Sequence, residues 1–246
     1  MASKAIPDSK LFPKSSWWAI PMCRFITWLA ACLIYRMRWR GVHNVPKEGP
    51  FILASNHQSY LDPPLMGVAP RHRAFRYMSK ETYFRIPIAS WVMFHTNTFP
   101  IDRAARFDRR AYQLCLDTLK QGLGLILFPE GTRTRDGRLG VLQPGVARMA
   151  LLTGAAVVPV GLTGAYEAWP HGSRRPHLSA ITLKYYRPIM VEKCEKPSEL
   201  GERSQELTEK LRKILDRRVR AYWRWKERKA KPTHAANATA GQRYAK

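Results

Sequence analysis

Residues 51 to 64 of the 246-residue chain read FILASNHQSYLDPP, and the interpretation of the remaining sequence starts from them. The run from Phe51 to Ser55, entered through Gly49 and Pro50, has the length and apolar character of a buried strand. Asp62, which stands before two prolines, is typical of the residue that caps the N-terminus of a helix. The sequence therefore predicts a strand, a short loop and a helix, with His57 in the loop.

His57 and Asp62 form a candidate catalytic pair. Residues five apart on a continuous helix point about 140° away from each other, so only a loop lets the carboxylate reach back to the imidazole. An imidazole with one ring nitrogen bound to a carboxylate presents the other nitrogen as a general base near neutral pH. On these two residues alone, the alternative is an Asp that only caps a helix and a His that only ends a strand.

The composition indicates a basic protein with anionic partners. Forty-two Lys and Arg residues face 18 Asp and Glu residues, which gives a formal net charge of +24. Such a charge suits nucleic acid, an anionic membrane surface or acidic substrates. The four cysteines form no C-x-x-C motif, so neither a metal site nor a disulfide framework is expected, and a cytoplasmic-side location follows.

The N-terminal part, residues 1–40, is expected to contain a basic arm and a membrane-associating helix. Residues 17–35 are apolar and aromatic, but Pro21 and Arg24 interrupt them. The uninterrupted part, residues 25–35, is shorter than the ~20 residues that a bilayer core requires. We expect a helix that lies in the membrane interface without spanning it, and no cleavable signal peptide. The alternative is an amphipathic helix that packs only on the protein's own core.

Residues 41–197 alternate between strand and helix patterns and predict one α/β catalytic domain. The fold class expected is a mixed, mostly parallel sheet with helices on both faces, with ligands at the carboxyl ends of the strands. The expected strands cover residues 51–55, 74–79, 98–101, 124–128, 156–160 and 181–186. One expected helix begins at Pro63, and the others cover residues 82–94, with an interruption at Pro87, 107–120 and 146–152.

Residues 198–231 predict a basic amphipathic helix, and residues 232–246 a disordered tail. The second half of the helix interleaves lysine and arginine with Tyr222, Trp223 and Trp225, which favours a surface for anionic lipid headgroups over a merely solvated helix. A nucleic-acid-binding protein would instead place aromatic residues on a basic sheet or groove. The aromatic residues gather in the two terminal helices, so no nucleic-acid partner is expected.

Three further motifs fall at the ends of predicted strands: FPIDR at residues 99–103, FPEGTRT at residues 128–134 and VVPVGL at residues 157–162. The first two place Arg103 and Arg133 at what we expect to be neighbouring strand ends. Two planar guanidinium groups so placed suit bidentate phosphate binding. The third motif is apolar and suits the lining of a site.

In this order, the four motifs resemble those of the glycerolipid acyltransferases, and among them the lysophosphatidate acyltransferases. The resemblance spans residues 40–190 and rests above all on N-H-x-x-x-x-D at residues 56–62 and F-P-E-G-T-R-T at residues 128–134. It implies an enzyme of phospholipid synthesis that moves a fatty acyl group from acyl-CoA or acyl carrier protein to the free hydroxyl of lysophosphatidate, which gives phosphatidate. No metal or further cofactor is implied, and the enzyme would act at the cytoplasmic face of a membrane.

The resemblance also implies a role for each site residue. His57, held by Asp62, would deprotonate the acceptor hydroxyl. Acceptor binding would fall to five residues of the second and third motifs, with Glu130 and Thr132 positioning groups around two arginines and with a glycine permitting close backbone approach: Arg103, Glu130, Gly131, Thr132 and Arg133.

One departure from the family pattern concerns the acceptor. Gln143 occupies the lysine-like position of a segment that resembles the family's K-x-G-x-x-R-x-A, with Arg148 at its arginine. The alternative substrate is therefore another lysophospholipid, a lyso-aminolipid or the hydroxyl of a glycolipid.

Overall fold

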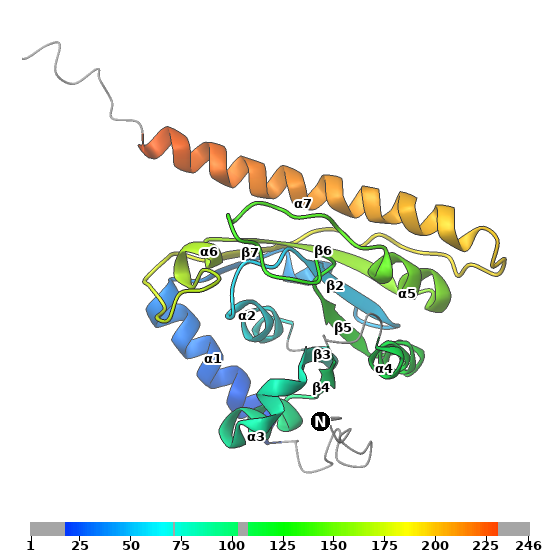
Figure 1. Cartoon of the computed structure of the whole chain (residues 1–246), viewed down its shortest axis with the longest axis horizontal. Helices are drawn as coiled ribbons and strands as arrows, with labels where there is room; N and C mark the ends of the chain where they lie inside the picture. The colour runs from blue at the N-terminus through cyan, green and yellow to red at the C-terminus, as the bar shows by residue number, and fades with distance from the viewer. Residues whose placement is uncertain (1–17, 71, 103–107, 231–246) are drawn as a thin grey trace, which may run out of the picture.

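The computed structural model describes residues 18–70, 72–102 and 108–230 and has a seven-stranded sheet at its centre (Figure 1). The strand order is β1-β7-β6-β2-β5-β3-β4, and β6 and β7 are the one antiparallel pair among these described strands. The mixed, mostly parallel sheet is confirmed. The strands are β1 (Arg38–Arg40), β2 (Phe51–Ser55), β3 (Phe75–Lys80), β4 (Thr98–Ile101), β5 (Gly124–Leu127), β6 (Ala156–Thr163) and β7 (Thr182–Tyr185).

Helices cover both faces of the sheet, as the sequence predicted. The α-helices are α1 (Ala19–Tyr35), α2 (Asp62–Val68), α3 (Pro87–His95), α4 (Arg109–Lys120), α5 (Gly145–Thr153), α6 (Ala165–Ala168) and α7 (Leu200–Ala230), and the 3₁₀ turns are η3 (Val42–Asn44) and η4 (Glu81–Arg85). Alternate residues of β2 point to opposite faces. Ile52 and Ala54 pack with residues of α4, α5 and α7, whereas Phe51 and Leu53 pack with residues of α1 and α2.

Several element boundaries differ from those expected. The interruption expected at Pro87 within residues 82–94 is present, but the part before it is the 3₁₀ turn η4, and the α-helix α3 begins at Pro87 itself. Strand β6 continues to Thr163, and the sequence pattern missed both β1 and α6. The N-terminal arm at residues 1–17, Phe107 at the expected start of α4, and the C-terminal tail lie outside the described residues.

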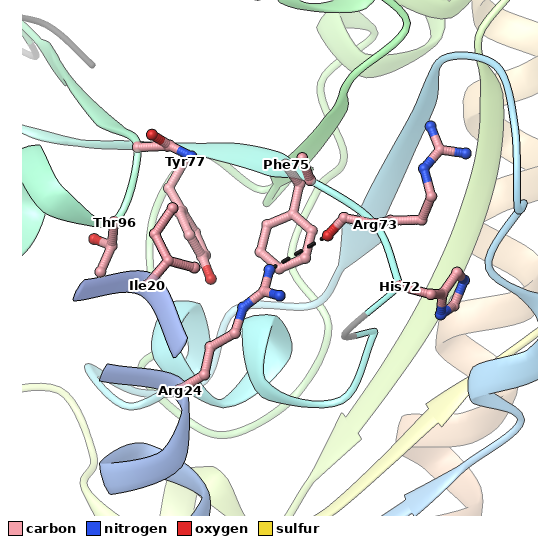
Figure 2. A pocket seen from close by; sticks show the side chains of 9 residues that line it. Ile20, Arg24, His72, Arg73, Phe75, Tyr77 and Thr96 are labelled. Atoms are coloured by element: carbon pink, nitrogen blue, oxygen red, sulfur yellow. Dashed lines mark hydrogen bonds between the residues drawn. The ribbon is translucent and has the colours of Figure 1, made fainter. Parts of the chain in front are cut away.

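Helix α1 packs against α2 and α3 (Figure 1), and it exposes large apolar side chains. Phe25 and Ile26 are each 57% exposed, and Leu33 is 73% exposed. Arg24 points the other way: its Nη2 atom donates to the carbonyl oxygen of Arg73 at 3.3 Å, and its guanidinium carbon lies 4.6 Å from the ring centroid of Phe75 (Figure 2). The arginine that interrupts the apolar segment therefore faces the sheet.

A small cavity of about 250 Å³ surrounds this contact between α1 and β3 (Figure 2). None of the helices in the described ranges combines the length and the apolar character needed to cross a membrane.

Helix α7 is part of the core along most of its length. Leu207, Leu211 and Leu215 are buried against α5 and the sheet, at the i, i+4 spacing of one helix face. Beyond Val219 the helix carries the aromatic and basic residues noted in the sequence, and there it runs past α6 (Figure 1).

Candidate active site

His57 and Asp62 meet in the loop between β2 and α2, as predicted. The Nδ1 atom of His57 lies 2.7 Å from Oδ2 of Asp62, and both side chains are buried. The backbone N–H groups of Gln58 and Ser59 also donate to Oδ2, at 2.6 and 2.8 Å. One carboxylate oxygen thus closes the loop and fixes the imidazole.

The carboxylate of Asp62 does not cap the following helix, which corrects one prediction. Asp62 is the first residue of α2, and its side chain turns back toward the preceding loop. Burial raises the pKa of Asp62, while the hydrogen bonds from His57, Ser59 and Gln58 act in the opposite direction. The three hydrogen bonds therefore stabilise the carboxylate form of Asp62, whereas its burial away from water destabilises that form.

The ring of His57 is oriented for proton transfer. It stacks on Phe128, with ring centroids 4.0 Å apart and an interplanar angle of 19°. Because Nδ1 is used by Asp62, Nε2 is the nitrogen left to take a proton, and it has no hydrogen-bond partner among the described residues. This is the arrangement of a histidine base oriented by an acid.

The side chain of Glu130 is hydrogen-bonded to the backbone of the histidine loop. Its Oε1 accepts from the N–H of His57 at 2.7 Å, and its Oε2 accepts from the N–H of Gly140 at 2.7 Å. The carbonyl of His57 accepts from the N–H of Thr134 at 2.8 Å. Both oxygens of Glu130 are therefore committed to backbone groups, and in the structure it positions the histidine and not the arginines, contrary to expectation.

Burial raises the pKa of Glu130 to about 7, although the two backbone N–H groups that it binds favour the carboxylate form. The nearby carboxylates of Asp62 and Asp136 add to the rise. This acid consequently titrates within the physiological pH range while it is hydrogen-bonded to the backbone of the histidine that carries the base.

Arg133 lies over the loop that carries His57. Its guanidinium carbon is 3.4 Å from the ring centroid of Tyr60, and its buried Nη1 atom has no hydrogen-bond partner in the described part of the chain. Tyr60 in turn contacts Trp169, with ring centroids 5.4 Å apart. An arginine held flat on an aromatic ring of the histidine loop is suited to an anionic substrate group.

The other predicted acceptor-binding residues are less informative. Arg103 lies outside the described residues, and its strand β4 is separated from β5 by β3, so the two arginine motifs do not follow neighbouring strands as expected. The side chain of Thr132 is exposed. Gly131 has φ +69°, and no atom lies within 4 Å of where its Cβ would be, so the turn requires glycine for its backbone conformation and not for close packing.

Two residues with a structural role at the site were quoted in the motif but given no function. The side-chain amide of Asn56 bonds both backbone groups of Leu162 in β6, through Nδ2 at 2.9 Å and Oδ1 at 2.8 Å. The side chain of Gln58 donates to the carbonyl of Gly137 at 3.1 Å. The sequence contained a signal for these roles, since buried side-chain amides need hydrogen-bond partners and both residues stand in a loop that follows a buried strand.

The Val157–Val160 motif lies inside β6, which pairs with β2, and its residues are fully buried on both faces of the sheet. In the structure it supports the site from the core. Among the described residues, no group of three or more His, Cys, Asp or Glu side chains could hold a metal ion.

Comparison with known proteins relates this geometry to enzymes of lipid acylation. Over 141 residues the chain is 37% identical to a chloroplastic 1-acyl-sn-glycerol-3-phosphate acyltransferase of Arabidopsis thaliana, a match that covers 56% of this chain and 39% of that relative. Over 148 residues it is 30% identical to a lyso-ornithine lipid O-acyltransferase of Pseudomonas aeruginosa, covering 60% of this chain and 52% of that protein. The chain thus spans about two fifths to one half of the length of these two relatives.

A solved structure agrees over a larger share of the chain. The 1-acyl-sn-glycerophosphate acyltransferase PlsC of Thermotoga maritima superposes with a TM-score of 0.70 at 27% identity, and the match covers 89% of this chain and 83% of that one. The family model named Acyltransferase matches residues 36–163, which run from the start of the sheet through the His57 loop to the end of β6. Since this match covers just over half of the 246 residues, the protein belongs to the acyltransferase family.

Proposed function

We propose that the protein transfers a fatty acyl group from a thioester donor to the free hydroxyl of lysophosphatidate, which gives phosphatidate. The observation that carries the proposal is the buried pair of His57 and Asp62, with Nδ1 held at 2.7 Å and Nε2 left to act as the base. Relatives named 1-acyl-sn-glycerol-3-phosphate acyltransferases support the choice of acceptor.

In the proposed reaction, Nε2 of His57 takes the proton of the acceptor hydroxyl as its oxygen attacks the thioester carbonyl carbon. Asp62 stabilises the imidazolium that forms. A new C–O bond replaces the C–S bond, and the departing thiolate receives the proton back from the imidazolium. The reaction needs no covalent acyl-enzyme and no cofactor besides the donor, which would be acyl-CoA or acyl carrier protein.

The acceptor phosphate would bind at Arg133, whose guanidinium is fixed by Tyr60 near the histidine loop. Arg103 and Thr132 would add contacts from their motifs. A second acceptor class, a lyso-aminolipid, is favoured by the relative that is named a lyso-ornithine lipid O-acyltransferase and by Gln143 in the lysine-like position.

The protein would bind one leaflet of an anionic membrane from the cytoplasmic side. Helices α1 and α3 supply the support for this, because they contact each other and both expose large apolar side chains, including Leu33 and Ile88. A contiguous apolar surface of this kind marks a membrane or protein contact. The basic residues at the end of α7 would add attraction to anionic headgroups.

The test is turnover by the purified full chain. Lysophosphatidate and a panel of other lysolipids, including a lyso-aminolipid, would each be offered with acyl-CoA and with acyl-loaded carrier protein, and the products identified by mass. We expect lysophosphatidate to be the best acceptor and His57→Ala to lower kcat by about 10²–10⁴-fold without loss of the folded state. A variant that kept more than about a tenth of the wild-type kcat would contradict the mechanism, and a preferred acceptor without phosphate would contradict the substrate.

A further inference from the structure

A cavity of about 770 Å³ lies between the end of α7 and residues of the strands β1, β6 and β7. Three of its lining residues lie side by side at the ends of neighbouring strands. Thr163 is the last residue of β6 and pairs with Thr182 at the start of β7. Thr182 also pairs with Arg38 at the start of β1. Strands β6 and β2 are parallel neighbours, so their carboxyl ends lie on the same side of the sheet. The His57 loop begins at the carboxyl end of β2. Three strand spacings of about 4.8 Å place β1 roughly 14 Å from β2 across the sheet.

The wall of this cavity is strongly cationic. Among the described residues that line it there are five lysine or arginine side chains and one carboxylate, Glu167. The cations come from two directions: Arg36 and Arg38 from the sheet side, and Arg218, Lys226 and Lys229 from α7. Positions 218, 222, 225, 226 and 229 follow the spacing of one helix face, so α7 presents a row of charged and aromatic side chains to the cavity.

The one carboxylate leaves most of this charge unbalanced. Glu167 accepts hydrogen bonds from Lys226 and from the hydroxyl of Tyr222, at 3.0 Å for the latter. Arg218 reaches Thr163 through Nη2 at 3.2 Å, but its buried Nε atom has no hydrogen-bond partner among the described residues. Like Nε of Arg218, Oε2 of Glu167 is buried without a hydrogen-bond partner among the described residues. The cavity suits an anion because its cations outnumber this one carboxylate.

The cavity also offers an aromatic surface. Trp225 lines it and is 46% exposed, and the ammonium nitrogen of Lys229 lies 4.9 Å from the centroid of the Trp225 ring. A planar base can stack on such a ring, which contributes about 1–3 kcal/mol per base in nucleic-acid complexes.

Two chains of contacts connect the cavity to the histidine loop. Helix α6, which carries Glu167, is followed directly by Trp169, whose ring contacts Tyr60. Trp223, next to the cavity residue Tyr222, donates from Nε1 to the carbonyl of Gly137 at 3.0 Å, and Gln58 donates to the same carbonyl. The wall of the cavity is therefore linked to the loop that carries the base through Trp169 and through Gly137.

We propose that this cavity binds the nucleotide head of a coenzyme A thioester, with its phosphates on the cations and its adenine on Trp225. The inference rests on the proposed function, since it assigns the donor of that reaction. A molecule with a 3′-phosphate and a diphosphate matches five clustered cations better than a lipid headgroup with a single phosphate. Its flexible pantetheine arm bridges the separation between the nucleotide and the thioester along the sheet edge. The volume also falls in the usual range for small-molecule sites.

The experiment measures binding without turnover. Coenzyme A and adenosine 3′,5′-bisphosphate are titrated into the purified full chain by calorimetry at 0.1 M salt. The double variant Arg38→Gln, Lys229→Gln changes two exposed cavity residues, and the matched control Arg217→Gln, Arg224→Gln removes the same charge from exposed α7 positions outside the cavity lining. We expect the cavity variant to weaken both ligands at least tenfold and the control to change Kd less than threefold. Equal weakening by both variants, or none by the cavity variant, overturns the proposal.

Two further measurements, enzyme kinetics and vesicle binding, distinguish coenzyme A from a lipid headgroup as the ligand of the cavity. The cavity variant should raise KM for acyl-CoA while KM for acyl carrier protein, which carries no nucleotide, stays unchanged. Lost binding to anionic vesicles together with intact coenzyme A binding would make this a lipid site and overturn the assignment. If coenzyme A binds through these residues but lysophosphatidate is not acylated, the donor site stands and the proposed acceptor fails.

Discussion

Asp62 uses one carboxylate oxygen for three donors, and this asymmetry defines the catalytic loop. Oδ2 holds His57, Gln58 and Ser59, whereas Oδ1 is buried without a hydrogen-bond partner among the described residues. The side chain therefore orients the imidazole and shapes the loop backbone at the same time, so a change at this residue affects both.

The variant Asp62→Asn should lose about 10²–10⁴-fold in kcat. Its amide oxygen can take the place of Oδ2 and still accept from the backbone N–H groups and from His57, but it carries no charge to stabilise the imidazolium. Its NH₂ group would then lie at the buried position of Oδ1, where no acceptor is present among the described residues. Steady-state kinetics with circular dichroism as the check on folding would measure this. Asp117→Asn on α4, whose side chain is 44% exposed, is the matched control and should keep wild-type kcat. Near wild-type activity in Asp62→Asn would mean that Asp62 serves only the loop.

Glu130 should make stability depend on pH between about 4.5 and 7. Its pKa is raised from 4.5 to about 7 in the folded chain, so the folded state holds this proton where the unfolded state has released it. The resulting contribution to the free energy of unfolding is complete below about pH 4.5 and is lost as pH rises through 7.

The check is urea unfolding of the wild type and Glu130→Gln at pH 5 and pH 8. The glutamine cannot titrate, so the wild type should lose stability relative to the variant between the two values. A stability difference that is the same at both pH values would show that Glu130 does not titrate in this range.

At the scale of elements, α7 is a core helix with a functional end. Leu215 is fully buried and belongs to the same cluster as Ile52 and Leu125 of the sheet, whereas the residues after Val219 face α6 and the cavity. The boundary expected near residue 198 therefore does not separate the helix from the packing of the catalytic domain.

Leu215→Ala should lower the free energy of unfolding by about 2–5 kcal/mol, because it leaves a cavity between α7 and the sheet. Arg217→Ala, exposed on the same helix, should change it by less than about 0.5 kcal/mol. Chemical denaturation of the full chain gives both values. A small effect at Leu215 would mean that α7 is a separable appendage.

The sequence predicted those elements whose signal is local. The apolar runs of β2, β5 and β6 and the histidine loop follow from a few adjacent residues. Strand β1 was missed because Arg38-Trp39-Arg40 is short and charged, and it is defined only by its pairing with β7. Strand order is equally non-local, so the expectation that the two arginine motifs follow neighbouring strands was wrong.

The role of Glu130 was missed for the same reason. The sequence shows a glutamate beside a glycine turn, but it does not show that the backbone N–H of His57, 73 residues earlier, lies within hydrogen-bond distance. In physical terms, patterns of adjacent residues encode secondary structure, whereas the partners of buried polar groups depend on how the elements assemble.

At the scale of the whole molecule, the apolar faces of α1 and α3 and the basic end of α7 should bind a membrane by different forces. Apolar insertion is insensitive to salt, whereas attraction between exposed charges weakens as the Debye length falls from ~10 Å at 0.1 M to ~3 Å at 1 M. Salt therefore separates the two contributions.

The variant Leu33→Glu, Ile88→Glu, at side chains 73% and 81% exposed, should reduce binding to anionic vesicles at both 0.1 M and 1 M salt. Arg217→Gln, Arg224→Gln should reduce it only at 0.1 M, with each charge worth about 1 kcal/mol. Vesicle sedimentation measures both. Wild-type binding by the glutamate variant at 1 M salt would exclude α1 and α3 as the membrane face.

The amide of Asn56 bonds a residue that lies 106 positions later in the chain, and this has a consequence for biosynthesis. The side chain of Asn56 finds its partner only when β6 has paired with β2, and the backbone N–H of His57 finds its acceptor only when Glu130 is in place. A chain emerging from the ribosome thus cannot complete its catalytic loop until residue 162 is outside the exit tunnel. Contacts of such long sequence separation also form late in refolding, so recovery of activity should lag behind the recovery of helix signal.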